Sequence, residues 1–179
     1  RGMGKFVAIG LNYADHAAEA NMPIPAEPIV FMKATSCAVG CNHPLVLPQG
    51  SRKTDWEVEL GLVIGQRARC VSEADALAHV QGYTVCNDYA VRDYLENWYR
   101  PNLRVKNRDG ATALGPWLVS ADEVPDPQAL GLRTRVNGRV EQQGHTRDMI
   151  HSVAALIEYL SGFMTLMPGD VITTGTPPG

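Results

Sequence analysis

The most informative part of the sequence is TDWEVELGLVIG, residues 54–65, in which acidic residues alternate with Trp, Val and Leu. Side chains two residues apart in a strand share a face, so the alternation predicts a β-strand. It places Asp55, Glu57 and Glu59 on one face of that strand. The run 62–64 is apolar on both faces, which predicts that the strand enters the interior of the protein.

Three neighbouring carboxylates repel one another, and partly buried carboxylates need a compensating cation. Two interpretations of residues 55–59 follow. In the first, the acids lie on an edge strand in contact with water. In the second, they form a divalent-metal site of hard oxygen ligands, which suits Mg²⁺ or Mn²⁺ better than zinc. The alternation alone leaves both open.

The composition of the chain predicts one domain over residues 1–179, because 179 residues with 45% hydrophobic content can form one sizeable core. A formal net charge of −3 gives no basic surface for nucleic acid, and no apolar run approaches the ~20 residues of a membrane span. The abrupt ends lead us to expect missing sequence at either terminus. Scattered cysteines predict reduced thiols in a cytoplasmic protein. They are Cys37, Cys41, Cys70 and Cys86.

A candidate lid lies near the N-terminus, where residues 11–20 predict a short helix with Asn12 or Asp15 as its N-cap. On such a helix His16 and Glu19 share a face, because they are three residues apart. The three prolines that follow forbid regular structure. Two interpretations stay open: a mobile lid that carries a His–Glu pair, or a surface helix whose pair lies in solvent.

The remaining patterns predict a β-rich α+β protein. Asn137-Gly138 is a strong hairpin signal between two extended runs, and Ser72 with Asp75 is typical of a capped helix start. One strand is expected to deliver Asp88 at its end. The predicted strands are 5–10, 29–33, 45–47, 83–89, 115–120, 132–136, 139–143 and 171–174, and the predicted helices are 71–80, 90–96 and the amphipathic 151–164.

A basic counterpart to the acidic strand follows at Arg104, Lys106 and Arg108. These residues alternate, so a strand would present them on one face. They form either a solvated basic face or one wall of a pocket. An acidic strand and a basic strand in one small domain would suit opposite walls of a pocket for an anionic, metal-bound ligand.

Several short motifs, taken in order, resemble those of the fumarylacetoacetate hydrolase superfamily over nearly the whole chain. Each motif alone is weak, whereas their order and spacing are specific. They are Gly-Leu-Asn-Tyr-x-x-His-x-x-Glu at 10–19, Phe-Met-Lys at 31–33, Asp-Trp-Glu-Val-Glu-Leu at 55–60, Gly-Tyr-x-x-x-Asn-Asp at 82–88, Arg92-Asp93, Lys106, Gly-Pro-Trp at 115–117 and Pro-Gly-Asp-x-Ile-x-Thr-Gly-Thr-Pro at 168–177.

The resemblance implies a mixed β-sandwich or β-roll that dimerises and binds Mg²⁺ or Mn²⁺. Carried over by motif, the implied metal ligands are Glu57, Glu59 and Asp88, with Asp55 as a supporting or structural carboxylate. Relatives continue for several strands beyond the Thr-Gly-Thr-Pro motif. We therefore expect a catalytic domain that is incomplete at its C-terminus.

The segment 85–110 looks most like the branch of decarboxylases and isomerases in homoprotocatechuate breakdown. That branch implies an enolate-forming enzyme for 2-oxo and 2-hydroxydienoic di- or tricarboxylates. The alternatives are an acylpyruvate hydrolase, an oxaloacetate decarboxylase or a non-catalytic relative. The resemblance assigns catalysis to His16, Glu19 and Lys106, and substrate contacts to Arg92, Tyr99, Arg104 and Thr176.

Overall fold

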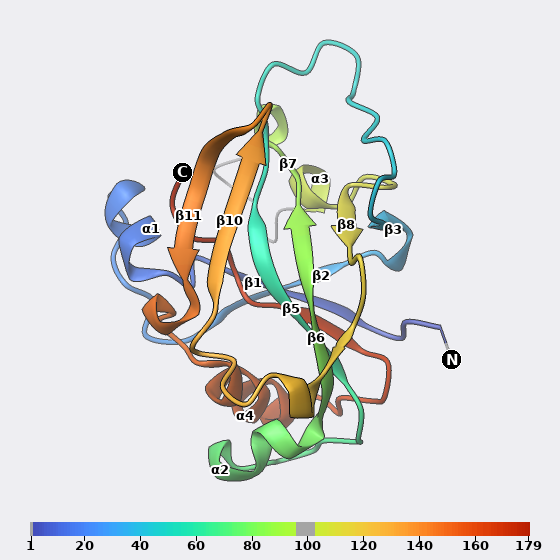
Figure 1. The fold of residues 1–179 in the computed structure, drawn as a ribbon, viewed down its shortest axis with the longest axis vertical. Coiled ribbons are helices and arrows are strands. Elements are labelled where there is room, and N and C mark those ends of the chain that lie inside the picture. Colours follow the sequence, from blue (N-terminus) through green and yellow to red (C-terminus); the bar gives the residue numbers. More distant parts are fainter. Residues whose placement is uncertain (1, 96–102) are drawn as a thin grey trace.

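In a computed structural model of the chain, residues 2–95 and 103–179 are described. They form a curled β-sheet with helices α2 (Glu73–Ala76) and α4 (Val153–Phe163) at one end and a β-hairpin alongside it (Figure 1). This arrangement confirms the predicted β-rich α+β class. None of the helices in the described part of the chain is long and apolar enough to cross a membrane.

Eight strands of the described residues pair in the main sheet, and two small sheets accompany it. The order of the main sheet is β2 (Ile29–Lys33), β1 (Phe6–Gly10), β12 (Val171–Thr173), β5 (Val58–Ile64), β6 (Val80–Asp88), β8 (Thr112–Leu114) and β3 (Ala38–Gly40), and β9 (Val119–Ser120) also pairs with β6. The small sheets are β10 (Gly131–Val136) with β11 (Arg139–His145), and β4 (Thr54–Asp55) with β7 (Ala90–Val91). β1 with β12 and β3 with β8 are parallel, and the other described pairs are antiparallel.

Apart from α4, the helices of the described residues are short. α4 begins after Ser152, whose hydroxyl accepts a hydrogen bond from Ala155 N (3.1 Å), an N-cap that contributes about 1 kcal/mol. The remaining helices are α1 (Ala14–Glu19) and α3 (Leu103–Lys106), with 3₁₀ turns at Thr35–Cys37, Leu77–His79, Arg92–Tyr94, Ala121–Glu123 and Thr146–Asp148.

The main apolar core lies between the sheet and α4. Leu62 and Ile64 of β5 belong to the same buried cluster as Leu156 and Leu160 of α4, and all four are fully buried. Burying each such side chain contributes about 1.5–3 kcal/mol. The prediction that this strand enters the interior is therefore confirmed.

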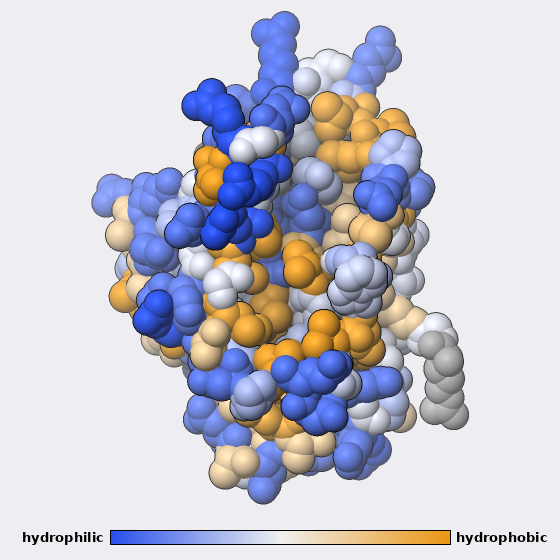
Figure 2. All heavy atoms as spheres, viewed as in Figure 1, coloured by the Kyte–Doolittle hydropathy of each residue, from blue (hydrophilic) through white to orange (hydrophobic). Residues whose placement is uncertain are grey.

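Part of the sheet surface remains exposed. Figure 2 shows hydrophobic side chains gathered over β5 and β6, beside the hairpin. On β6, Val85 is 49% exposed, and Trp117 in the connection between β8 and β9 is 73% exposed.

Most predicted elements are confirmed within a residue or two. They are the strands at 5–10, 29–33, 83–89 and 171–174, the hairpin around Asn137-Gly138, the helix at 151–164, and a helical segment within 71–80. All four cysteines are free, and Cys37 and Cys86 are buried. The free thiols confirm that the cysteines form no disulfide framework.

The predicted strand over 54–64 is divided in two. β4 ends at Asp55 and pairs with β7, whereas β5 begins at Val58 and pairs with β6. The break separates Asp55 from the other two acids, and its carboxylate pairs instead with Arg92 (2.8 Å). Relief of like-charge crowding is the physical reason that the continuous alternation is not realised.

The predicted basic strand at 104–108 is wrong, because this segment begins as helix α3. Arg104 and Arg108 lie on the same side, with guanidinium carbons 4.7 and 4.6 Å from the centre of the Tyr94 ring. Lys106 lies on the other side and is buried. Arg104 and Lys106 are two residues apart in α3 and so lie on different faces of the helix, and Arg108 follows its end, so the three cations are not aligned as a strand would align them.

The predicted helix at 90–96 is also wrong. β7 occupies 90–91, and a 3₁₀ turn follows. Arg92 N donates to Lys53 O (2.7 Å), and the Asp93 carboxylate accepts from Ser51 Oγ (2.7 Å) and from Lys53 N (3.0 Å). These bonds join the segment to the loop before β4 and compete with helical hydrogen bonding.

Two of the predicted strands, 115–120 and 45–47, do not form as predicted. The segment 115–120 is interrupted at Gly115, where φ is +126°, and at Pro116, which has no N–H to donate, so strand structure resumes only at β9. The segment 45–47 has prolines on both sides and pairs with no strand of the described residues.

The predicted helix caps are not formed by side chains. The residue before α1 is Tyr13, and the amide of Asn12 is used elsewhere, in a hydrogen bond from its Nδ2 to Thr174 O (2.9 Å). Ser72 does precede α2, but its hydroxyl donates to the Asp75 carboxylate (2.7 Å) rather than accepting from the backbone. Tertiary contacts of Asn12 thus override its capping propensity.

Candidate metal centre and active-site cavity

Three carboxylates meet at one end of the β5–β6 pair. Glu59 lies in β5, Glu57 immediately precedes it, and Asp88 ends β6. Antiparallel pairing brings them level, since Val58 is opposite Asn87 and Asp88 N donates to Glu57 O (2.9 Å). One oxygen from each carboxylate lies within 4.8 Å of the other two, and all three residues are buried. The structure thus brings together the three acids named as metal ligands.

The free edge of β5 near these acids is completed by side chains and loop backbone, because β12 ends at Thr173. The hydroxyl of Thr176 donates to Val58 O (2.9 Å), and Gly175 N donates to Glu59 Oε2 (2.9 Å). Gly175 has φ +88°, a conformation that favours glycine. The segment after β12 therefore fixes the position of one ligand carboxylate.

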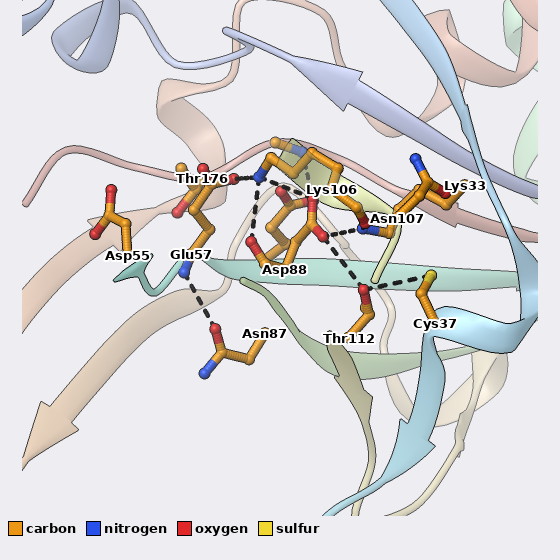
Figure 3. Close-up of polar contacts among 12 residues, drawn as sticks. Lys33, Cys37, Asp55, Glu57, Asn87, Asp88, Lys106, Asn107, Thr112 and Thr176 are labelled. Atoms are coloured by element: carbon orange, nitrogen blue, oxygen red, sulfur yellow. Dashed lines mark hydrogen bonds and ion pairs between the residues drawn. The ribbon is translucent and has the colours of Figure 1, made fainter. Parts of the chain in front are cut away.

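Three cations surround the acids, as Figure 3 shows for the two lysines. Lys106 Nζ donates to Glu57 Oε2 (2.5 Å) and lies 3.0 Å from Asp88 Oδ2. Lys33 Nζ, which has no exposed surface, donates to Asp88 Oδ1 and to Lys106 O (2.7 Å). Arg92 Nη2 donates to Glu57 Oε1 (2.9 Å). Every acid except Glu59 thus has a direct cationic partner among the described residues.

The charges of this cluster shift its pKa values in opposite directions. Burial, together with the charges of Asp88 and Glu57, raises the pKa of Glu59 to about 8. Burial also acts on Asp88, but the ammonium groups of Lys106 and Lys33 outweigh it and hold the pKa of Asp88 below its usual range. Burial lowers the pKa of Lys106, and the charges of Asp88 and Glu57 reverse that effect, so its pKa is raised and it stays protonated.

The donor set fits a divalent cation with hard oxygen ligands. Glu59 is the acid that lacks a direct cationic partner among the described residues, and its buried carboxylate lies beside the carboxylates of Glu57 and Asp88. A dication would supply the positive charge missing at Glu59. Glu57, Glu59 and Asp88 are the residues that would hold Mg²⁺ or Mn²⁺.

Glu57 and Glu59 border a cavity of about 340 Å³ that is lined by both polar and apolar residues. Its size and its mixture of apolar surface with a few convergent polar groups are typical of a small-molecule site. The polar lining comes from His16, Glu57, Glu59, Arg92, Lys106 and Thr176, and the apolar lining comes mainly from Ile9, Leu11, Met22, Ile29, Phe31 and Leu95.

Helix α1 brings the predicted His–Glu pair to this cavity. His16 lines the cavity, and its Nδ1 lies 3.4 Å from Glu19 Oε2 on the next turn of the helix. The Glu19 side chain is 54% exposed. A carboxylate beside one ring nitrogen orients the imidazole and leaves the other nitrogen for proton transfer.

Asp55 lies to the side of the cluster (Figure 3) and reaches it through Arg92. Arg92 donates from Nε (3.0 Å) and Nη2 (2.8 Å) to Asp55 Oδ2, while Nη2 also contacts Glu57. Arg92 thus joins the outer acid to a candidate metal ligand and still lines the cavity.

The other predicted substrate contacts have different placements. Thr176 lines the cavity, but its hydroxyl already donates to Val58 O and accepts from the Gln142 amide (2.9 Å). Arg104 packs on the ring of Tyr94 and is not among the residues that line this cavity. The fourth candidate, Tyr99, lies outside the described residues.

Two residues that sequence reasoning did not assign to the site belong to its surroundings. The Phe-Met-Lys motif contains Lys33, and a lysine that ends an apolar strand was a usable signal of a buried cation. Gln142 of the hairpin donates to Thr176 and accepts from Val58 N (3.0 Å). No local pattern marks Gln142, because its partners are far away in the sequence.

The chain is similar to known proteins in both sequence and structure. A family model described as fumarylacetoacetate (FAA) hydrolase C-terminal matches residues 5–179. The homoprotocatechuate catabolism bifunctional isomerase/decarboxylase of Escherichia coli is 57% identical over 176 residues, which is 98% of this chain and 41% of that protein. The chain thus spans about two fifths of that relative's length.

Two solved structures are similar as well. The 2-hydroxyhepta-2,4-diene-1,7-dioate isomerase from Mycobacterium marinum is 40% identical with a TM-score of 0.87, over 99% of this chain and 65% of that chain. Fumarylpyruvate hydrolase from Pseudomonas aeruginosa, in complex with Mn²⁺ and pyruvate, is 31% identical with a TM-score of 0.91, over 98% of this chain and 78% of that chain.

Proposed function

Because the chain belongs to the fumarylacetoacetate hydrolase family, we propose that it is a divalent-metal-dependent isomerase or decarboxylase in the breakdown of aromatic compounds. Its substrates would be 2-oxo or 2-hydroxydienoic di- or tricarboxylates, which react through an enolate. The observation that carries this proposal is the convergence of Glu57, Glu59 and Asp88 beside Lys106, at a cavity that His16 also lines.

The proposed cofactor is Mg²⁺ or Mn²⁺, held by Glu57, Glu59 and Asp88. When bound, such an ion acts as a Lewis acid on the keto and carboxylate oxygens of a 2-oxo acid. The Mn²⁺ and pyruvate in the structurally similar fumarylpyruvate hydrolase support this pairing of metal and ligand class. The hard oxygen donors of the present site support it from the protein side.

The charge balance of the site favours an anionic substrate. Four carboxylates, with Asp55 included, face the three cations Lys33, Lys106 and Arg92, so the ionised cluster carries one net negative charge. A dication changes this to one net positive charge. A carboxylate substrate would then enter a site of opposite sign, which lowers the free energy of its binding.

Proton transfer falls to the pair on α1. His16, oriented by Glu19, would move a proton from the hydroxyl group of the dienol to the far carbon of the diene in isomerisation, or return a proton to carbon after CO₂ leaves. Lys106 stays protonated and lines the same cavity, so its charge would stabilise negative charge that develops on the substrate oxygen. Closure of α1 over a bound substrate would exclude water from this step.

The apolar side of the cavity suits the carbon chain of such a substrate. Phe31, Leu11 and Ile9 line the same cavity as the charged groups, and a hydrocarbon segment in contact with them loses contact with water. The proposed orientation places the 2-oxo acid end at Glu57 and Glu59 and the diene along the apolar wall.

We also propose that the catalytic domain formed by residues 1–179 acts in the cytoplasm as a homodimer. The exposed hydrophobic surface around Val85 and Trp117 supports a second copy as its partner. Size-exclusion chromatography with light scattering tests this, and a monomer at micromolar concentration would contradict it.

Turnover measurements test the proposed activity. The purified protein is assayed with 2-hydroxyhepta-2,4-diene-1,7-dioate, oxaloacetate and acetylpyruvate, each with Mn²⁺ and with chelator. We expect the dienedioate to be turned over only with metal. Preference for acetylpyruvate would identify a hydrolase instead, and undiminished turnover in chelator would contradict the metal site.

A further inference from the structure

Gln142 is a buried amide that uses its complete hydrogen-bonding capacity. It lies in β11, with 2% of its surface exposed. Its Oε1 accepts from Val58 N (3.0 Å) and from the Thr134 hydroxyl (3.0 Å). Its Nε2 donates to the Thr176 hydroxyl (2.9 Å) and to Pro177 O (3.0 Å). A primary amide has two acceptor positions and two donor hydrogens, and all four are used.

These four bonds join three segments that are far apart in the sequence. Val58 lies between Glu57 and Glu59, and Thr176 lines the cavity. The hairpin supplies the glutamine but none of the residues of the cavity lining. One side chain thus connects the strand that carries Glu59 to the segment after β12, which contributes Thr176 to the cavity lining.

The bond to Val58 replaces part of the sheet. β12 pairs with β5 only at residues 61–63, so the edge of β5 at Val58 has no neighbouring strand there. Gln142 supplies the acceptor for Val58 N, and Thr176 supplies the donor for Val58 O. Because Gln142 also bonds to Thr176, the three groups form a closed ring of hydrogen bonds. Such a ring fixes the backbone between the two glutamates.

The chemistry of this position requires a glutamine. Val58 N–H needs an acceptor, whereas Pro177 O needs a donor, so the orientation of the amide is determined. A glutamate would not donate to Pro177 O, and a methionine of similar length would leave Val58 N without a partner. A buried backbone N–H that loses its partner is costly and shifts to find another.

We propose that Gln142 is a positioning residue that sets the spacing of Glu57 and Glu59, and the place of Thr176, without touching metal or substrate. This rests on the proposed metal-dependent function. Outer partners that orient metal ligands affect metal affinity or activity by about 10- to 100-fold when they are removed. Gln142 acts one step farther out, through the backbone of Val58.

The experiment compares Gln142→Met with two matched controls. Gln128→Met removes another bridging glutamine, whose Nε2 donates to Thr146 O (2.7 Å) and whose Oε1 accepts from Val153 N (2.9 Å), away from the cavity. Gln143→Met changes the exposed neighbour in the same strand. Mn²⁺ affinity is measured by calorimetry, the Mn²⁺ environment by electron paramagnetic resonance, and kcat and KM with the dienedioate, all below the unfolding temperature of each variant.

We expect Gln142→Met to weaken Mn²⁺ binding by about tenfold, to change the Mn²⁺ spectrum and to lower kcat. Gln128→Met should lower thermal stability with unchanged Mn²⁺ affinity and spectrum, and Gln143→Met should change neither. A Gln142→Met protein that is less stable but binds Mn²⁺ and turns over like the wild type would overturn the proposal.

A milder variant keeps the test decisive if Gln142→Met does not fold. Thr134→Val removes one of the two bonds to the Gln142 carbonyl and should weaken Mn²⁺ binding by about two- to threefold. Wild-type affinity and kcat in Thr134→Val would then overturn the proposal. A folded wild-type protein that binds no Mn²⁺ would overturn the proposed function together with this inference, whereas an active wild type with an equally active Gln142→Met would overturn the inference alone.

Discussion

At the Ile64–Val80 end of the β5–β6 pair, the side chains are apolar and pack in the core with α4, whereas at the Glu57–Asp88 end they are charged and equally buried. The apolar end gains free energy from every methyl group that leaves water. The charged end depends on Lys106, Lys33 and Arg92 for compensation and leaves Glu59 without a cation. The same two strands therefore stabilise the fold at one end and hold a reactive, destabilising cluster at the other.

The largest effect is expected from Glu59→Gln, which changes the charged end alone. Metal-dependent turnover should fall by roughly 1,000-fold or more, since loss of Lewis-acid stabilisation removes several kcal/mol. The metal-free variant should be at least as stable as the wild type, because a buried carboxylate without a cationic partner becomes neutral. Thermal unfolding with and without Mn²⁺ measures both. A variant that loses stability without metal would contradict the idea that this end is destabilising.

The next largest effect is expected from His16→Ala, which removes the proton-transfer group and leaves the acids in place. Turnover should fall by roughly 100- to 10,000-fold, the range for loss of general acid–base catalysis. Mn²⁺ affinity should stay at the wild-type value. The exposed His43 provides the control variant His43→Ala, which should retain full turnover. A large loss of Mn²⁺ affinity in His16→Ala would place this histidine at the metal instead.

The converse change is Leu62→Ala at the apolar end. It should lower the free energy of unfolding by about 2–5 kcal/mol, because it opens a cavity in the core. Mn²⁺ affinity should be unchanged. Urea denaturation and calorimetry provide the two measurements, with Val46→Ala, in the loop between β3 and β4 and 78% exposed, as a control that changes stability by less than about 0.5 kcal/mol. Loss of Mn²⁺ binding in Leu62→Ala would show that the two ends are not independent.

Part of the charged end could be predicted from the sequence, because the alternation of residues is a local pattern. A period of two placed Glu57 and Glu59 on one face, and an extended run was expected to deliver Asp88 at its end, whereas the resemblance to the family named the three acids as one ligand set. The same rule failed at Lys106, which lies in the cluster because α3 is helical and separates it from Arg104. Lys106 was named as a candidate site residue, but the secondary structure predicted for its segment was wrong.

The remaining features depend on contacts that no local pattern contains. Lys33 reaches Asp88 across 55 positions of sequence, and Gln142 reaches Val58 across 84. Such contacts follow from strand order and register, which the sequence pattern of a single segment does not determine. The break at 56–57 is similar, since it depends on the pairing of Asp55 with Arg92.

The smallest effect is a pH dependence that separates the two ends without changing the core. The pKa of Glu59 is about 8 in the fold, against 4.5 for an ordinary glutamate, so between these values the folded protein holds a proton that the unfolded chain releases. The contribution of Glu59 to the stability of the metal-free protein is complete below pH 4.5 and is lost as the pH rises to about 8. We expect the unfolding temperature of the metal-free protein to fall over that range. Saturating Mn²⁺ should abolish or reverse the trend, because the metal binds the ionised form, and Glu59→Gln should show neither response. A metal-free wild type whose pH profile matches that of Glu59→Gln would mean that Glu59 is already ionised, and that the charged end of the strand pair is compensated by its own lysines and arginine.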